Sequence, residues 1–215
     1  MEQRVGVAVL ALFLGGCLTG NFQYTAPQSV LVAANARVVN QSVDDVWKTL
    51  IPALGSRFFV INNLDKSSGL VNVSYSGNPE QYIDCGHIDA WVDNVRGKRT
   101  YNFAAASPMQ TYEVKSGTGL YVIERRMNLD GRINIILEAL DVDRTRVTAN
   151  TRYVVTRQMQ GRRIDLAIPY STSDTINFGS GQAADFPDRG SGAVRCEATG
   201  RLETAILDLL PSGSQ

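Results

Sequence analysis

The stretch between residues 110 and 157 constrains the fold more than any other part of the chain, because it alternates apolar and polar side chains. Ile133, Ile135 and Leu137 follow a period of two, which places every second side chain on the same face of a β-strand. Asp130-Gly131 interrupts the pattern and is typical of a two-residue hairpin turn, whose central residues need positive φ angles. The stretch therefore predicts an antiparallel meander with a tight turn at residues 130–131.

Two helices are predicted, one on each side of this meander. Between Ser42, the expected N-cap, and Gly55, apolar side chains recur every three or four positions. A second apolar stripe ends before Pro211 and consists of Ala198, Leu202, Ala205, Ile206 and Leu209. The order of elements predicts an α+β fold, in which the antiparallel sheet packs on a long C-terminal helix and a second helix lies near the N-terminus.

Shorter elements complete the prediction. Residues 36–39 are expected to form a strand, and residues 57–63 and 70–76 are expected to form a hairpin. Residues 171–193 are rich in Ser, Thr and Gly, and we expect them to form a surface loop. The bulky side chains expected in the core include Trp47, Phe58, Phe59, Tyr153 and Ile206.

The N-terminal residues indicate where the protein resides. An uncharged apolar run from Val5 to Leu14 is too short to cross a bilayer but fits the apolar part of a secretory signal. The following Leu14-Gly15-Gly16-Cys17 resembles the bacterial lipoprotein processing motif, in which the signal is cut before a cysteine that is then acylated. The resemblance implies a signal peptide at residues 1–16 and a lipid anchor on Cys17.

This resemblance also predicts the organisation and the location of the mature chain. Residues 17–34 are expected to be a lipidated tether, and residues 35–215 a single periplasmic α+β domain. Leu18 and Thr19 follow the cysteine, in place of the aspartate that retains such lipoproteins at the inner membrane. We therefore expect anchoring on the periplasmic face of the outer membrane of a Gram-negative bacterium.

Three cysteines are present, and a lipidated Cys17 leaves Cys85 and Cys196 as an even pair. Disulfides persist in the periplasm, so we expect these two cysteines to form a bridge. The alternative is a metal site, because Cys85, His87 and Asp89 alternate and would share one face of a strand. His87 is the only histidine, and zinc sites need three or four ligands, so we expect neither a metal nor a cofactor.

Charge and motif content argue against two classes of function. Lys plus Arg and Asp plus Glu both total 21, so no basic field is present to recruit nucleic acid. The sequence has no Gly-x-Ser-x-Gly nucleophile motif, and His87 lies beside a cysteine that is expected to be oxidised. We therefore expect no catalytic residues and a protein that is not an enzyme.

Residues 43–75, which read VDDVWKTLIPALGSRFFVINNLDKSSGLVNVSY, carry a second resemblance. With the order of elements and the motif at Cys17, they resemble the C-type lipoprotein of the outer-membrane β-barrel assembly machinery, whose domains have the helix-grip fold. The resemblance implies a non-enzymatic, lipid-anchored accessory or scaffold subunit of an outer-membrane or envelope protein complex, with no site residues to carry over. The alternative is a helix-grip module that binds an apolar ligand or lipid between sheet and helix.

Overall fold

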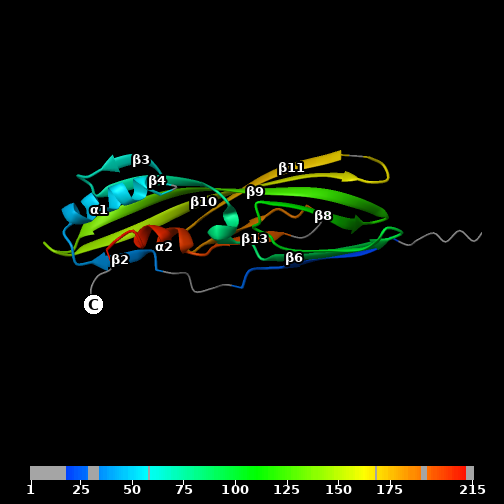
Figure 1. Cartoon of the computed structure of the whole chain (residues 1–215), viewed down its shortest axis with the longest axis horizontal. Helices are drawn as coiled ribbons and strands as arrows, with labels where there is room; N and C mark the ends of the chain where they lie inside the picture. The colour runs from blue at the N-terminus through cyan, green and yellow to red at the C-terminus, as the bar shows by residue number, and fades with distance from the viewer. Residues whose placement is uncertain (1–17, 29–33, 58, 168, 190–192, 212–215) are drawn as a thin grey trace, which may run out of the picture.

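A computed structural model describes residues 18–28, 34–57, 59–167, 169–189 and 193–211. The chain is mostly β, with 60% strand and 12% helix, and its strands form three sheets. Figure 1 shows an elongated molecule in which the two longest strands, β9 (Gly119–Ala139) and β10 (Thr145–Arg163), run along the whole length. Cys17, the proposed anchor, lies outside the described residues.

The predicted turn at Asp130-Gly131 is wrong, because both residues lie in the middle of β9. Gly131 pairs with Tyr153 of β10 on one side and with Tyr75 of β4 on the other. Strand partners on both sides hold the backbone extended where the sequence alone favours a turn. A Cβ at Gly131 would lie 2.9 Å from Cδ2 of Leu202, so this glycine allows the C-terminal helix to approach the sheet closely.

The largest sheet is built around β9 and β10. Its main strand order is β11 (Pro169–Gly179), β10, β9, β4 (Leu70–Gly77) and β3 (Val60–Asp65), while β2 (Ala36–Val39) pairs with β10 and β8 (Met109–Ser116) pairs with β9. The predicted strand at 36–39 and the predicted hairpin are confirmed, with the hairpin strands at β3 and β4.

The predicted surface loop at residues 171–193 is wrong over much of its length. Most of it forms β11 and β12 (Ala183–Phe186), and the side chains of Phe178 and Phe186 are buried. The polar residues of β11 misled the prediction, because its Ser and Thr residues lie mainly on the exposed face while Ile176 and Phe178 point inward.

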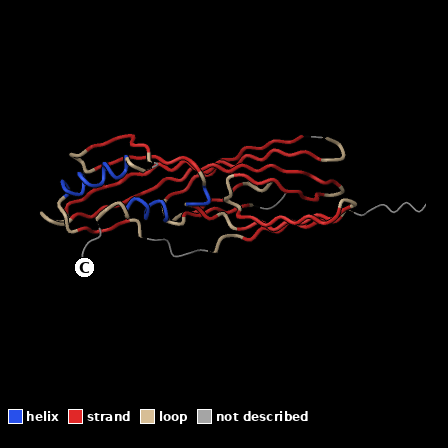
Figure 2. The backbone as a smooth tube through the Cα atoms, viewed as in Figure 1, coloured by secondary structure: helices blue, strands red, loops and turns tan. Residues whose placement is uncertain are grey.

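A second sheet covers one half of the long strands (Figure 2). It contains β1 (Thr19–Thr25), β6 (His87–Asn94) and β7 (Gly97–Ala104). Because β1 belongs to this sheet, the tether expected at residues 17–34 contains seven residues that are part of the folded body. The third sheet, β12, β13 (Val194–Ala198) and β5 (Ile83–Asp84), lies between the halves, next to the 3-10 helix η1 (Pro79–Gln81).

Two short helices cover the other half of the long strands (Figure 1). The first, α1 (Val43–Gly55), is confirmed, with Ser42 accepting a hydrogen bond from the backbone N–H of Asp45. Its buried side chains are Val46, Leu50 and Leu54. No helix among the described residues is both long and apolar enough to cross a bilayer.

The α+β, helix-grip-like fold with a long C-terminal helix is wrong, because the C-terminal helix α2 spans only Arg201–Leu207. Gly200, with φ at 74°, separates it from β13, so Ala198 belongs to a strand. A helix of two turns cannot cover the sheet, and a second sheet covers the remaining half instead.

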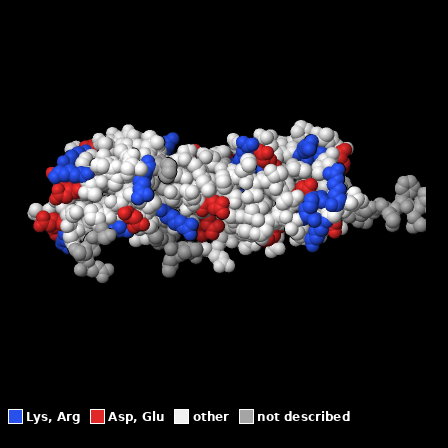
Figure 3. Space-filling model, in the orientation of Figure 1, with Lys and Arg blue, Asp and Glu red and all other residues white. Residues whose placement is uncertain are grey.

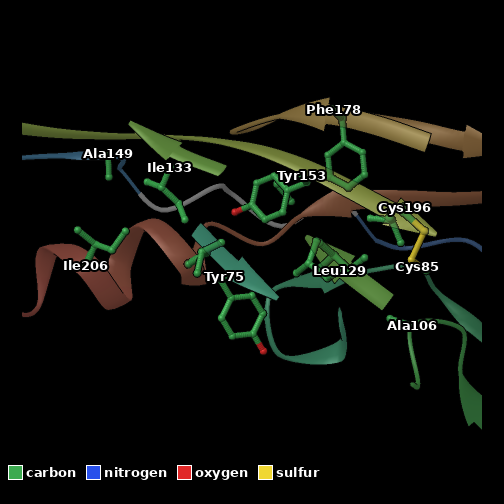
Figure 4. Close-up of a cluster of buried hydrophobic side chains, with 14 of the residues drawn as sticks. Tyr75, Cys85, Ala106, Leu129, Ile133, Ala149, Tyr153, Phe178, Cys196 and Ile206 are labelled. Atoms are coloured by element: carbon green, nitrogen blue, oxygen red, sulfur yellow. A yellow bond between two sulfur atoms is a disulfide. The ribbon is translucent and has the colours of Figure 1, made fainter. Parts of the chain in front are cut away.

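The core is continuous through both halves, and Figure 4 shows part of it at the point where they meet. Tyr153 and Ile206 are buried there as predicted, while Trp47 and Phe59 pack on the core from partly exposed positions and Phe58 lies outside the described residues. Cys85, which follows β5, and Cys196, on β13, are joined by the predicted disulfide (Figure 4).

Candidate functional site

A chamber of about 500 Å³ lies in the half of the molecule that is covered by the second sheet. Four aromatic rings line it, with Phe22 on β1, Tyr112 on β8, Tyr121 on β9 and Tyr170 on β11. The other lining residues are Val114, Lys115, Ser116, Ile123, Met159 and Arg189. Lys115 and Ser116 are exposed at the end of β8, so the chamber reaches solvent there.

The strand register arranges the floor of the chamber in successive rows. Tyr112, Ile123, Gly161 and Tyr170 lie opposite one another across β8, β9, β10 and β11. Two residues further along β9, the next row contains Arg125, Met159 and Thr172. The row after that contains Met127, Arg157 and Asp174. Aromatic and apolar side chains therefore lie nearest the open end, and charged side chains lie further in.

Gly161 is the residue that allows Tyr170 to lie over the floor of the chamber. A Cβ at this position would lie 2.2 Å from Cε1 of the Tyr170 ring, so any larger residue would push the ring away. A glycine inside a strand often marks such a close approach. The sequence contains this signal, although it did not enter the prediction.

Two arginines are buried beside the inner end of the chamber, in the next rows of the sheet, and neither lines the chamber itself. The side chain of Arg125 is only 1% exposed, and neither of its terminal nitrogens, Nη1 and Nη2, has a hydrogen-bond partner among the described residues. Arg157 is 2% exposed and lies over the ring of Phe186, with its Cζ atom 4.6 Å from the ring centroid. Burial lowers the pKa of Arg125 to about 10, so this side chain still carries its charge at neutral pH.

One carboxylate lies between Arg157 and the chamber wall. Asp174 accepts a hydrogen bond from Nη2 of Arg189 at 2.6 Å and another from Nη2 of Arg157 at 3.0 Å. These hydrogen bonds, with that from Arg189 contributing most, hold the pKa of the Asp174 carboxyl below its usual value. Because Arg189 lines the chamber, the ion pairs connect the chamber directly to the buried Arg157.

The phenol groups around the chamber stay protonated well above neutral pH. Burial raises the pKa of Tyr170 to about 12, and burial also raises the pKa of Tyr112. A neutral tyrosine presents an apolar ring and a hydroxyl that can donate a hydrogen bond. The chamber can therefore enclose an apolar body and still offer polar contacts to it.

A second buried polar cluster joins α2 to the sheet at the boundary between the halves. The Glu203 carboxylate is 1% exposed and accepts hydrogen bonds from the hydroxyls of Tyr153 at 2.7 Å and Ser180 at 2.6 Å. Burial is the main cause of the raised pKa of Tyr153. Both carboxylate oxygens are occupied by protein donors, so this cluster fixes the helix on the sheet.

The residues weighed as metal ligands do not converge. Cys85 is in the disulfide, and Asp89 accepts a hydrogen bond from Nδ2 of Asn102 on the neighbouring strand. Over the part of the chain that the structure describes, no group of three or more His, Cys, Asp or Glu side chains is placed to hold a metal ion.

Neither the chamber nor the two arginines beside it were predicted from the sequence. The alternation Ile123, Arg125, Met127, Leu129 was present in the sequence and puts Arg125 on the same face as its apolar neighbours. Comparisons with known proteins add no further site, because no family model, curated protein or solved structure matches this chain.

Proposed function

We propose that this chain is a lipid-anchored protein of the bacterial envelope whose two-sheet half binds an apolar or amphiphilic small molecule. The observation that carries the proposal is the chamber itself. Its volume of about 500 Å³ falls within the range of small-molecule sites, which are mainly apolar with a few polar groups. Its aromatic and aliphatic lining, with Arg189 and Lys115 at its borders, fits that description.

The position of the proposed anchor supports this function. Thr19, the first residue of β1, follows Cys17 by two positions, so the acylated cysteine would lie within about 7 Å of the start of that strand. Gly20, the next residue, lies against Lys115, since its Cβ would be 3.0 Å from the Cβ of Lys115. Lys115 borders the open end of the chamber, so an anchor on Cys17 would hold that end close to the membrane.

Exposed apolar and basic residues at the same end also support membrane proximity. Val95, at the tip of the β6–β7 hairpin, is 82% exposed, and Arg96 and Lys98 lie beside it. Leu166, just beyond the end of β10, is 55% exposed. Figure 3 shows Lys and Arg side chains gathered at this end of the molecule. Such a combination favours contact with an anionic lipid surface.

The test is to purify the tagged chain from membranes in mild detergent and to analyse the extract by mass spectrometry for small molecules and for proteins. The proposed function predicts a stoichiometric lipid or other amphiphile on the wild-type chain. A Cys17→Ser variant is the matched control, because it removes the acylation site and leaves the chamber intact. A chain that carries no small molecule and takes up none of the lipids offered to it would contradict the proposal.

A role as an accessory subunit of an envelope complex is the second candidate, and the edge strand β11 favours it. β11 is the last strand in its sheet order, and its eleven residues pair with β10 without a register shift. Long regular edges can accept a further strand from a partner. The same purification tests this role, since it predicts a protein partner whose recovery depends on Cys17 and is lost when Thr175 is replaced by Pro.

A further inference from the structure

We propose that Arg125, Arg157 and Thr172 form an anion-binding site at the inner end of the chamber, so that the ligand is an amphiphile with a carboxylate or phosphate head group. This inference rests on the proposed ligand-binding function and specifies the chemistry of the ligand.

Unpartnered polar atoms gather at this place in the fold. Seven buried side-chain nitrogen or oxygen atoms lack a hydrogen-bond partner among the described residues, and four of them belong to these three residues. They are Nη1 and Nη2 of Arg125, Nε of Arg157 and Oγ1 of Thr172. Buried polar groups are almost always hydrogen-bonded, so four unpaired atoms in two adjoining rows of one sheet indicate a missing partner.

The missing partner should carry negative charge. Three arginines approach this region, namely Arg125, Arg157 and Arg189. The carboxylate of Asp174 forms ion pairs with Arg157 and Arg189. No ion pair links Arg125 to any described residue, and its charge is nevertheless buried. A buried charge without a counterion is strongly unfavourable, and a carboxylate or phosphate can accept several guanidinium hydrogen bonds at once.

The chamber also fixes how such a ligand would lie. Tyr121 and Arg125 are four residues apart on β9, which corresponds to about 13 Å along the strand. Between them the floor is formed by Ile123 and by Tyr170 from β11. An apolar tail would therefore lie along the aromatic rows toward the open end, and the head group would reach the arginines.

The test measures binding of palmitate and methyl palmitate to the detergent-purified full chain by native mass spectrometry. The two lipids have the same acyl chain, but only palmitate carries a negative charge. We expect the wild-type chain to prefer palmitate by about tenfold or more, as charged hydrogen bonds in a buried site would give. Palmitoyl lysophosphatidate, offered in a third arm, distinguishes a phosphate head group from a carboxylate.

Arg125→Met should remove this preference by weakening the binding of palmitate. The matched control is Arg126→Met, because Arg126 is the next residue on β9, points to the exposed face and pairs with Glu124. The control should keep the full preference for palmitate. Thr172→Val provides an independent test and should reduce the preference by about twofold to tenfold.

Thermal unfolding separates this role from a structural one. Replacing a buried, uncompensated charge by an apolar side chain of similar size is neutral or stabilising, so the unfolding temperature of delipidated Arg125→Met should equal or exceed that of the delipidated wild-type chain. A lower unfolding temperature, together with an unchanged palmitate preference, would make Arg125 a structural residue and overturn the inference.

The outcomes distinguish this inference from the function on which it rests. If neither lipid binds the wild-type chain, the binding function itself fails. If palmitate and methyl palmitate bind equally well, or if the preference survives in Arg125→Met, the chamber binds a ligand but the anion site is wrong.

Discussion

The two halves of β9 and β10 belong to the same continuous strands but are covered in different ways. In the half that carries α1 and α2, the inward side chains of β9 are Ile133, Ile135 and Leu137, all 5% exposed or less. In the half under the second sheet, the same face of β9 presents Tyr121 and Ile123 to a chamber, and Arg125 follows them in the strand as a buried charge. On this face of β9, one half presents a row of buried aliphatic side chains, and the other combines a cavity with a buried charge.

This difference indicates that the half under the second sheet contributes less to the stability of the fold. Filling a core with apolar side chains is the most favourable use of buried positions, and an uncompensated arginine is among the least favourable. Among the residues that the structure describes, buried arginines lie only in the half under the second sheet. Local features of this kind are typical of functional sites, which is why we propose that the ligand binds in the half under the second sheet.

Loss of the disulfide should have the largest effect, because Cys85 leads into β6 of one half and Cys196 leads toward α2 of the other. The two cysteines are 111 positions apart, and a bridge that closes so long a loop contributes about 5 kcal/mol in the chain-entropy account. We expect urea unfolding of the Cys85→Ala, Cys196→Ala double variant to show a decrease of that size in the free energy of unfolding. Wild-type chain unfolded under reducing conditions is the control, and a loss below about 1 kcal/mol would show that the bridge does not couple the halves.

Truncating matched isoleucines on β9 should reveal the contrast in packing. Ile133→Ala leaves a cavity in the helix-covered half and should cost about 2–5 kcal/mol of unfolding free energy. Ile123 already borders the chamber, so Ile123→Ala removes fewer contacts and should cost about half as much. Denaturant unfolding of both variants gives the two values. Equal losses would mean that the chamber half is packed as tightly as the other.

Gly161→Ala should disturb the chamber without affecting the helix-covered half. The added Cβ would displace the Tyr170 ring into the chamber, at a cost of about 1–3 kcal/mol, and should reduce the uptake of palmitate. In a Tyr170→Ala background the same substitution should cost almost nothing, because the ring is absent. If the two substitutions prove additive, the proposed contact between Gly161 and Tyr170 is not the cause.

Alkaline pH should destabilise the chamber half because its tyrosines ionise. We expect this effect to be the smallest of the four predicted here. The ordinary tyrosine pKa is 10.0, whereas the pKa of Tyr170 in the folded chain is about 12. Between these values the unfolded chain releases a proton that the folded chain retains, so the free energy of unfolding falls as pH rises from 10 to 12. Thermal unfolding across this range should show a shallower decline in Tyr170→Phe than in wild type, and identical declines would contradict this assignment.

The sequence predicts an element well where its stabilising interactions join residues that are close in sequence. Ser42 caps α1 through a backbone hydrogen bond three residues away, and the β3–β4 hairpin turns within a few residues at Asp65 to Gly69. The pairing of Cys85 with Cys196 followed from counting cysteines once Cys17 was assigned to the anchor, and the bridge is present in the structure. These predictions depend on contacts between residues close in sequence, or on the even number of cysteines that remain.

The candidate site could be predicted only in part. Strand alternation was enough to place Arg125 on the inward face with Ile123 and Met127, but it could not show that its terminal nitrogens lack partners. Whether these nitrogens find hydrogen-bond partners depends on which side chains of β8, β10 and β11 lie next to Arg125. The register of these strands against β9 decides this. The ion pairs of Asp174 likewise depend on Arg189 returning to the chamber wall after β12.

The sequence by itself determined the elements whose hydrogen bonds are made within a few residues, namely α1, the β3–β4 hairpin and the alternating faces of the strands. Only the tertiary structure decided that Asp130-Gly131 continues a strand, that the C-terminal helix stops after two turns and that a second sheet covers the remaining half. The physical reason is that a short segment favours a turn or a helix only weakly, and partners from distant parts of the chain supply enough hydrogen bonds and buried area to override that preference.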